Sequence, residues 1–444
     1  MSEVGTFIGK PTKPLGVKAQ MAAAIIGNSM EWYDFMVFAF MTPIISKLFF
    51  PSGHEGDPLN AILLTTALFG AGFIMRPIGG IVLGIYADRK GRKAAMTLVM
   101  ILMMISVLLV TFTPTYRSAG IVAPFIVLIS RLLQGFSVGG EFGTSTSFLI
   151  ELSPKGKTGF FGSWQIAGQL LALVVGASIG MVLTSCLTMA QINAGAWRIP
   201  FAFGLLIIPI TLYMRVKLTE PSTFRNNKEK PALRESDEDL MSTLRKYLVG
   251  MGMVAASAVS FYVTFGYTVT YAKTVLKLPV TQSFMVQMIA AIVMFIVVPI
   301  AGAVSDRVNR KGLLLASIIG YILVLYPLYS WVTSAPSIER LLISQIIAGI
   351  FSATFLGVYC TTLVELYAVR VRAMALGIVN NVAVVIFGGF SQFFVTLLLK
   401  MTGSSLAPVF YVIVCLVIGL IAVIFMPDLQ RRTHQIDVAV RAKT

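Results

Sequence analysis

Five ionisable side chains stand inside long apolar stretches of this sequence: Glu31, Asp34, Arg76, Arg131 and Glu141. If such a stretch crosses a membrane, a charge within it costs at least ~2.5–3.5 kcal/mol, so it needs a partner, a cavity or a function. Arginine offers a planar fork to a carboxylate, and a carboxylate can take up and release a proton. Together these residue types indicate the binding of an organic anion and the movement of protons.

The spacing of the five residues suggests their roles. We expect Arg76 or Arg131 to bind a substrate carboxylate. Glu31 and Asp34 share a helix face at i and i+3, and we expect Asp34, with Glu31, to carry the coupling proton. The alternative is a permanent ion pair between Asp34 and Arg76. Glu141 is either a further proton site or a tie between helices at a glycine-rich contact.

Uncharged polar side chains form a second group inside the apolar stretches. A stripe from Ser260 to Tyr271 has helical spacing, so it should face a cavity or another helix rather than lipid. Each single amide has the alternative role of an interhelical hydrogen bond. Besides the two arginines, the residues expected to contact substrate are Asn28, Gln134, Gln165, Tyr267, Tyr271, Gln345 and Asn381.

Other chemistry is not indicated. His54 and His434 stand in polar segments, which leaves proton coupling to the carboxylates. The three cysteines lie within apolar runs and have neither disulfide nor metal-site spacing. The sequence holds no nucleophile–base pair and no metal-ligand cluster, so we expect neither an enzyme nor a metal or cofactor.

The composition is that of a polytopic membrane protein. Of 444 residues, 57% are hydrophobic and 12% are charged, and the mean hydropathy is +0.85. A soluble fold of this size cannot hide so much apolar surface and needs about twice that charge. This excludes a cytosolic enzyme, a secreted disulfide scaffold and a disordered chain. The first apolar run follows a polar segment with no cleavable signal, so we expect it to remain as a membrane helix.

Twelve apolar stretches are long enough to span a bilayer, which takes ~20 residues. Their approximate ranges are 19–46, 59–87, 94–113, 121–151, 158–186, 197–215, 247–275, 281–304, 313–333, 338–367, 373–400 and 406–427. We expect an all-α fold with an N-tail (1–18), a six-helix bundle (19–216), a linker loop (217–246), a second six-helix bundle (247–427) and a C-tail (428–444).

The distribution of Lys and Arg predicts the orientation. With the N-terminus in the cytoplasm, 26 of the 35 fall in cytoplasmic segments and seven in external ones. This asymmetry places both termini in the cytoplasm. The net charge of +16 is spread over short loops rather than gathered on one domain, so we do not expect nucleic-acid binding.

The two halves resemble each other. Gly84-x3-Asp88-Arg89-Lys90-Gly91-Arg92-Lys93 recurs as Gly302-x3-Asp306-Arg307-Val308-Asn309-Arg310-Lys311. A shift of 214 residues takes Ser130, Gly135 and Glu151 onto Ser344, Gly349 and Glu365, and Arg131 onto Gln345. This favours a parallel duplication, in which the substrate site lies near the midplane between the halves.

These repeated loops resemble the signature of the major facilitator superfamily, with Asn309 replacing the usual Gly in the second copy. Further motifs resemble its metabolite:proton symporter family over residues 20 to 427. They are Gly27-Asn28-x2-Glu31-Trp32-Tyr33-Asp34-Phe35, Met75-Arg76-Pro77-Ile78-Gly79-Gly80, Arg131–Glu141, Trp197–Phe201 and Glu220-Pro221-x2-Phe224. This family imports small carboxylates such as citrate, 2-oxoglutarate and shikimate, or proline and betaine, together with protons.

The resemblance also implies conformational roles for charges at the cytoplasmic edge. The expected gating residues are Gly84, Asp88, Arg89, Arg92, Glu151, Asp306, Arg310, Glu365 and Arg372. The alternative is that these charges only fix topology. No substrate contact is expected of them.

The sequence therefore predicts a proton-coupled importer of a small organic acid with one to three carboxylates, acting as a monomer in the inner membrane. The two intramembrane arginines favour an anion, and Phe261–Leu276 resembles the citrate-type members. The alternative is a proline or betaine symporter. A sensor or a lipid-modifying enzyme is disfavoured, because neither a large soluble domain nor a catalytic cluster is present in the sequence.

Overall fold

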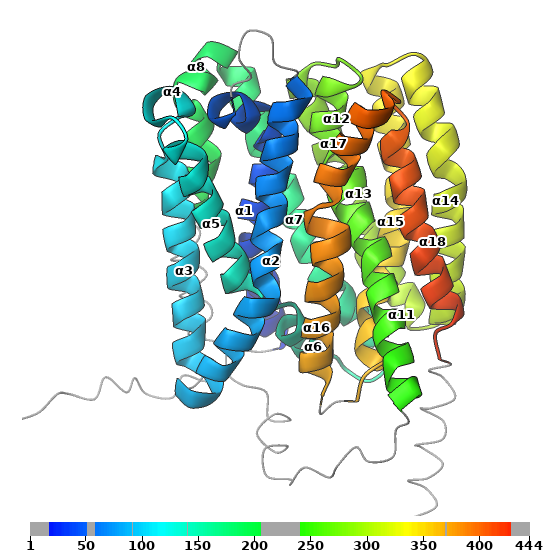
Figure 1. Ribbon diagram of the computed structural model, residues 1–444. Coiled ribbons are helices and arrows are strands. Elements are labelled where there is room, and N and C mark those ends of the chain that lie inside the picture. The colour runs from blue at the N-terminus through cyan, green and yellow to red at the C-terminus, as the bar shows by residue number, and fades with distance from the viewer. Residues whose placement is uncertain are drawn as a thin grey trace, which may run out of the picture.

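The computed structural model describes residues 17–50, 58–90, 92–139, 141–205, 240–368 and 371–427. Every regular element in these residues is a helix, and the long helices stand side by side (Figure 1). We call the end of the bundle at which Asp306 lies the Asp306 end. The opposite end, at which Lys400 lies, is the Lys400 end.

The first half of the chain supplies one group of helices, drawn from blue to green in Figure 1. They are α1 (Val17–Phe49), α2 (Pro58–Lys90), α3 (Arg92–Phe112), α4 (Tyr116–Ala119), α5 (Val122–Val138), α6 (Glu141–Glu151), α7 (Thr158–Cys186), α8 (Met189–Ala194) and the 3-10 turn η1 (Ala196–Arg198). A further helical stretch covers 199–205, where the sixth predicted span begins.

The second half supplies the other group, from green to red. Its elements are α11 (Leu240–Val259), η2 (Ser260–Phe265), α12 (Thr268–Thr274), α13 (Val280–Ser305), α14 (Arg310–Ser334), α15 (Ile338–Glu365), α16 (Arg372–Val384), η3 (Val385–Gly389), α17 (Ser391–Thr402) and α18 (Ala407–Ile424). Both η2 and η3 are π-helical turns.

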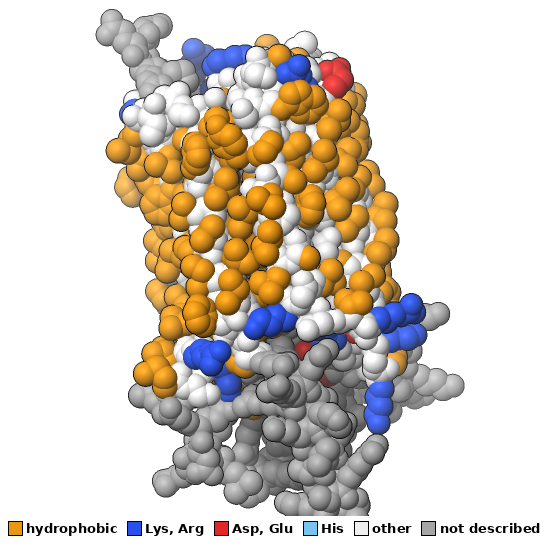
Figure 2. Space-filling view, turned by 90° about the vertical axis from the view of Figure 1, so that its right-hand side faces the viewer, with side chains coloured by type: hydrophobic (Ala, Val, Ile, Leu, Met, Phe, Trp, Pro, Cys, Tyr) orange, Lys and Arg blue, Asp and Glu red, His pale blue; other side chains and the backbone are white. Residues whose placement is uncertain are grey.

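In the described residues, nine helical stretches are long and apolar enough to cross a membrane, and each coincides with a predicted span. Of the other three predicted spans, the first is α1 and the third is α3. Most of the sixth lies outside the described residues. The lateral surface is apolar, with exposed side chains such as Ile81, Leu323 and Val414, while Lys and Arg gather at the two rims (Figure 2). This is the surface of a protein that spans a bilayer.

Within the described residues, two predicted spans are not continuous α-helices. The seventh and the eleventh each contain a π turn, whereas the fourth comprises α5 and α6. Hydropathy does not reveal such breaks, because the side chains around them remain apolar. The described part of α11 begins at Leu240, seven residues before the predicted seventh span. Lys246, assigned from sequence to the linker, is buried in that helix.

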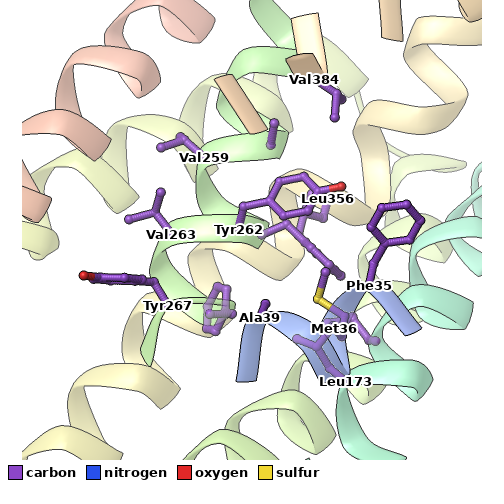
Figure 3. Packing of buried hydrophobic residues seen from close by; sticks show 14 of the residues in the cluster. Phe35, Met36, Ala39, Leu173, Val259, Tyr262, Val263, Tyr267, Leu356 and Val384 are labelled. Atoms are coloured by element: carbon purple, nitrogen blue, oxygen red, sulfur yellow. The ribbon is translucent and has the colours of Figure 1, made fainter. Parts of the chain in front are cut away.

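The buried core runs continuously from one half to the other. Phe35, Met36 and Leu173 of the first half pack with Tyr262 and Leu356 of the second (Figure 3). Helix α7 packs against α13, and α2 against α17, which joins the two halves on both sides of the centre. The elements that hold the predicted site residues are therefore fixed against one another.

Candidate functional site

A small cavity lies between the two halves, near the middle of α1 and α2. Its charged lining residues are Glu31, Arg76 and Glu141, all from the first half. The second half contributes Asn380 and Asn381, from α16. The remaining lining residues are Asn28, Trp32, Val138, Phe142 and Gln165. The cavity thus brings together six of the twelve residues predicted from sequence to bind substrate or protons.

Arg76 is buried in an aromatic wall. Its guanidinium carbon lies 4.0 Å from the centre of the Phe73 ring, 4.7 Å from Phe35 and 5.6 Å from Trp32. Tyr262 of the second half approaches the same guanidinium and packs edge-on against Phe73 at 5.4 Å. A desolvated cation over aromatic faces gains roughly 2 kcal/mol or more. In addition, Nε and Nη2 of Arg76 make no hydrogen bond with the described residues, so this fork can bind an incoming anion.

Close approach of α2 and α5 places this arginine. A Cβ on Gly135 would lie 1.5 Å from the Gly72 carbonyl oxygen, and one on Gly139 would lie 2.0 Å from the Arg76 carbonyl oxygen. The two backbones therefore touch, as small residues permit in membrane helices. This contact holds together the two helices that bear Arg76 and Arg131.

Asp34 and Arg131 form a second charged site, away from the cavity. Each side chain acts electrostatically on the other, and both are buried. Asp34 Oδ1 makes no hydrogen bond with the described residues, and neither do Nε and Nη1 of Arg131. The Arg131 guanidinium lies 4.5 Å from the centre of the Phe38 ring. Arg76 lies against the aromatic wall instead, so the permanent Asp34–Arg76 ion pair considered from sequence is not the arrangement found.

The amides divide between the cavity and helix contacts. Asn28 Nδ2 donates to the Gln165 carbonyl oxygen at 2.8 Å, and Gln165 Nε2 donates to Asn28 Oδ1 at 3.3 Å. These bonds tie α1 to α7 while both residues line the cavity. Asn381 donates to the Gly139 carbonyl oxygen at 2.5 Å and so joins the two halves. Gln134 is fully buried outside the cavity lining, and its amide has no hydrogen-bond partner among the described residues.

Tyr267, Tyr271 and Gln345 lie elsewhere than expected. The two tyrosines line a separate small cavity inside the second half, beside Tyr329. Tyr267 is hydrogen-bonded to the Thr396 hydroxyl at 2.8 Å, Tyr271 donates to the Ser405 carbonyl oxygen at 2.9 Å, and Gln345 donates to the Tyr329 hydroxyl at 3.1 Å. These side chains stabilise the second bundle and do not face the central cavity. The polar pattern in the sequence predicted that the two tyrosines share a helix face, but it did not predict which helix that face contacts.

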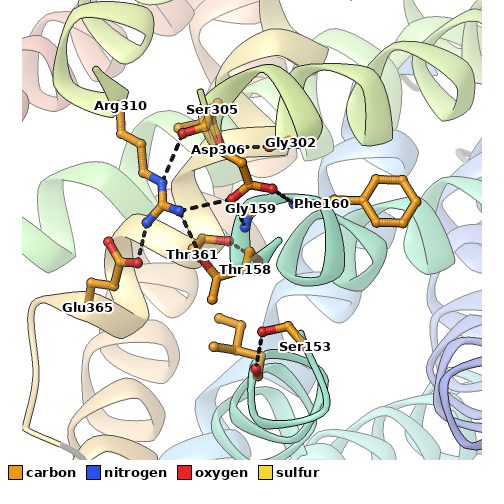
Figure 4. A network of polar contacts seen from close by, with 12 residues as sticks. Ser153, Thr158, Gly159, Phe160, Gly302, Ser305, Asp306, Arg310, Thr361 and Glu365 are labelled. Atoms are coloured by element: carbon orange, nitrogen blue, oxygen red, sulfur yellow. Dashed lines mark hydrogen bonds and ion pairs between the residues drawn. The ribbon is translucent and has the colours of Figure 1, made fainter. Parts of the chain in front are cut away.

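An ionic network joins the halves at the Asp306 end (Figure 4). The Asp306 carboxylate accepts hydrogen bonds from the backbone N–H groups of Gly159 (2.7 Å) and Phe160 (3.0 Å). These are unsatisfied donors in the first turn of α7, so Asp306 caps a helix of the other half. Arg310 joins the network through Asp306 (3.2 Å), the Thr158 hydroxyl (2.8 Å) and the Glu365 carboxylate.

Arg372 extends this network. Burial holds the pKa of its guanidinium below the ordinary value, and the nearby carboxylates of Glu151 and Glu365 oppose that shift. Arg372 also donates to the Val364 carbonyl oxygen at 3.1 Å. Gly84 faces open space, since a Cβ added there would have no atom of the described residues within 4 Å. The side chains of Asp88, Arg89 and Arg92 lie outside the described residues.

The halves also meet at the Lys400 end. Lys400 donates to the Asn60 side chain, and the Thr281 hydroxyl donates to the Thr184 carbonyl oxygen at 3.2 Å. Between this contact and the cavity lies the aromatic wall, where Trp32 packs against Phe261 at 5.4 Å. The cavity is therefore enclosed, with a contact between the halves on each side of it.

Sequence reasoning missed the aromatic wall and the helix cap. Phe73 precedes Arg76 by three residues, so helical spacing alone indicates that contact. Tyr262 and the α7 N-terminus come from distant parts of the chain, and no local pattern signals them. Among the described residues, no group of three or more His, Cys, Asp or Glu is placed to hold a metal ion.

A charged cavity between two halves of a helical bundle with an apolar lateral surface is the arrangement of a membrane transporter. The sequence profile of the Major Facilitator Superfamily matches residues 24–326 and 286–441. The chain belongs to this superfamily, as its motifs predicted, and is a transporter rather than an enzyme.

Named relatives include small-metabolite symporters. The chain is 36% identical to a citrate-proton symporter of Salmonella typhi, over 89% of this chain and 91% of that protein. It is 34% identical to the citrate-proton symporter of Klebsiella pneumoniae, over 90% and 89%. It is 30% identical to the glycine betaine/proline/ectoine/pipecolic acid transporter OusA of Dickeya dadantii, over 93% and 83%.

Solved structures confirm the fold. A D-xylose-proton symporter superposes with a TM-score of 0.75 at 18% identity, over 93% of this chain and 98% of that one. The predicted all-α fold of the superfamily is thereby confirmed.

Proposed function

We propose that this protein imports a small organic acid together with protons, by alternating exposure of the central cavity to the two sides of the membrane. The observation that supports this most directly is Arg76. It is a buried, desolvated guanidinium with unused donors that faces a cavity between the two halves. The citrate-proton symporters among the relatives point to the same substrate class.

The charges of the cavity and of the Asp34–Arg131 site give a reason why protons are needed. The set Glu31, Asp34, Arg76, Arg131 and Glu141 carries a formal net charge of −1. A substrate carboxylate adds a further negative charge in a medium that screens poorly, which is costly unless a proton enters with it. We assign this proton to Asp34, because its Oδ1 is buried without a hydrogen bond that would lock the carboxylate in its charged form. Glu31, one turn away, links it to the cavity.

The ionic network at the Asp306 end, which we call the gate, supports alternating access. Asp306 holds the α7 N-terminus across the two halves, and Arg372 lies beside carboxylates from both. We propose that this end faces the cytoplasm, as the distribution of Lys and Arg indicates. Breaking the network would then open the cavity inward, while breaking the Lys400–Asn60 contact would open it outward.

A betaine-type or proline substrate is the second candidate, favoured by the aromatic wall and by relatives such as the Dickeya transporter. Aromatic cages bind quaternary ammonium groups. Here the guanidinium of Arg76 already occupies those ring faces. The wall therefore supports an anion site better than an ammonium site.

Uptake into proteoliposomes with an imposed inward proton gradient tests the proposal. The labelled panel is citrate, 2-oxoglutarate, succinate, shikimate, proline and betaine. We expect accumulation of a carboxylate, its collapse with a protonophore, and its loss in Arg76→Gln. Arg340→Gln is the matched control, because Arg340 also lies over a tryptophan ring but at the Lys400 end, away from the cavity. Accumulation of proline or betaine alone would overturn the carboxylate assignment.

A further inference from the structure

Two π-helical turns face each other in the second half. In η2 the Gly266 N–H bonds to the Phe261 carbonyl oxygen at 2.9 Å, the i→i−5 pattern of a π turn. Segment η3 packs against η2, and a Cβ on Gly388 would lie 2.8 Å from the Tyr262 ring. Such turns are rare, and they concentrate at functional sites because they change the direction of side chains within a helix.

Gln392 of α17 is hydrogen-bonded to the first of these turns. Its Nε2 donates to the Tyr262 carbonyl oxygen at 3.0 Å, within the π turn. Gly266 makes room for this bond, because a Cβ there would lie 2.7 Å from the Tyr262 oxygen and 3.2 Å from Gln392 Nε2. Gln392 is fully buried, and its Oε1 has no hydrogen-bond partner among the described residues. Among the described residues, the amide of Gln392 therefore makes one hydrogen bond, to the Tyr262 backbone.

The residue held in this way belongs to the wall around Arg76. The Tyr262 ring contacts Phe73 at 5.4 Å, Trp32 at 5.9 Å and Phe69 at 6.1 Å. Trp32 and Phe73 are two of the three rings over which the Arg76 guanidinium lies. A shift of the Tyr262 backbone would thus loosen the packing of the substrate-binding arginine.

We propose that Gln392 is a positioning residue for substrate binding, which holds the π turn of η2 and, through Tyr262, the orientation of Arg76. This inference rests on the proposed role of Arg76. Gln392 touches neither the cavity nor Arg76, so its effect passes through Tyr262.

Gln392→Met tests this, because methionine keeps the length of the side chain and removes the donor. The control is Gln287→Met, a fully buried glutamine of α13 whose amide has no partner among the described residues. We expect Gln392→Met to raise the half-saturating substrate concentration about three- to tenfold, the range for one ordinary hydrogen bond. The maximal rate should stay within about twofold, since transport itself is not impaired. Gln287→Met should leave both unchanged.

A double-variant cycle identifies the route of the effect. In a Tyr262→Ala background, Gln392→Met should change half-saturation by less than about twofold, because the intermediary is gone. An equal change in both backgrounds would overturn the proposed route. Equal changes in Gln392→Met and Gln287→Met would show a general packing effect and would also overturn it.

Hydrogen exchange of the peptide over 260–267 tests, without any substrate, whether Gln392 stabilises the π turn of η2. We expect faster exchange in Gln392→Met than in wild type or Gln287→Met, because the π turn loses its tie. Unchanged exchange overturns the inference. If wild-type vesicles accumulate no acid, the proposed function fails, whereas this measurement still decides whether Gln392 holds the turn.

Discussion

Replacing Asp306 by asparagine should release the gate at the Asp306 end. The carboxylate accepts two backbone N–H bonds from α7, at 2.7 and 3.0 Å, and also faces Arg310. Asparagine retains one acceptor oxygen and turns an amide donor toward the helix N-terminus. One hydrogen bond to a charged group is worth about 1.5–3 kcal/mol, and the helix charge adds a fraction more. A loss of about 2–3 kcal/mol shifts the ratio of open to closed gate by about 30- to 150-fold.

Spin labels across the gate measure this shift. Cysteines at the exposed positions Lys155 and Arg307 place one label in each half, in a background that lacks the three native cysteines. We expect wild type to show mainly the short distance and Asp306→Asn to show a large longer-distance population. Glu339→Gln, at the opposite end, is the control and should match wild type. A short distance of unchanged population in Asp306→Asn would refute the view that this cap holds the halves together.

Three further variants test the site and the packing. Arg76→Lys keeps the charge but loses the planar fork, so half-saturation in uptake assays should rise about tenfold, roughly 1.4 kcal/mol; unchanged half-saturation would contradict direct binding. Asp34→Asn should abolish gradient-driven accumulation while substrate exchange across the membrane persists; gradient-driven accumulation in this variant would place the proton elsewhere. Gly135→Ala places a Cβ 1.5 Å from the Gly72 carbonyl oxygen, so it should destabilise the protein by more than the ~1–3 kcal/mol of ordinary overpacking and lower the melting temperature. Gly84→Ala is the control, because a Cβ there has open space around it, and its stability should stay within about 0.5 kcal/mol of wild type.

Much of the architecture was predictable because a bilayer imposes simple rules on sequence. Span length, hydropathy and the Lys and Arg distribution depend on each stretch separately, and the nine apolar spans found in the described residues coincide with predicted ones. The π turns η2 and η3 were not predicted, because a π turn changes backbone hydrogen bonding without changing hydropathy.

The site was predictable in part. Intramembrane charge marked Glu31, Arg76 and Glu141, which do line the cavity. Pairing was not predictable, because helix rotation decides whether Asp34 faces Arg76 or Arg131. The same limit applies to Tyr267, whose helix face was correct but whose neighbour is Thr396.

The most direct test of the central claim is proton movement driven by substrate. Proteoliposomes with no pH gradient would carry an entrapped pH indicator, and an inward gradient of the transported acid would be applied. Proton-coupled import predicts acidification of the interior that follows acid entry, that Arg76→Gln abolishes and that Arg340→Gln leaves intact. Acid entry without any change of internal pH would contradict the account.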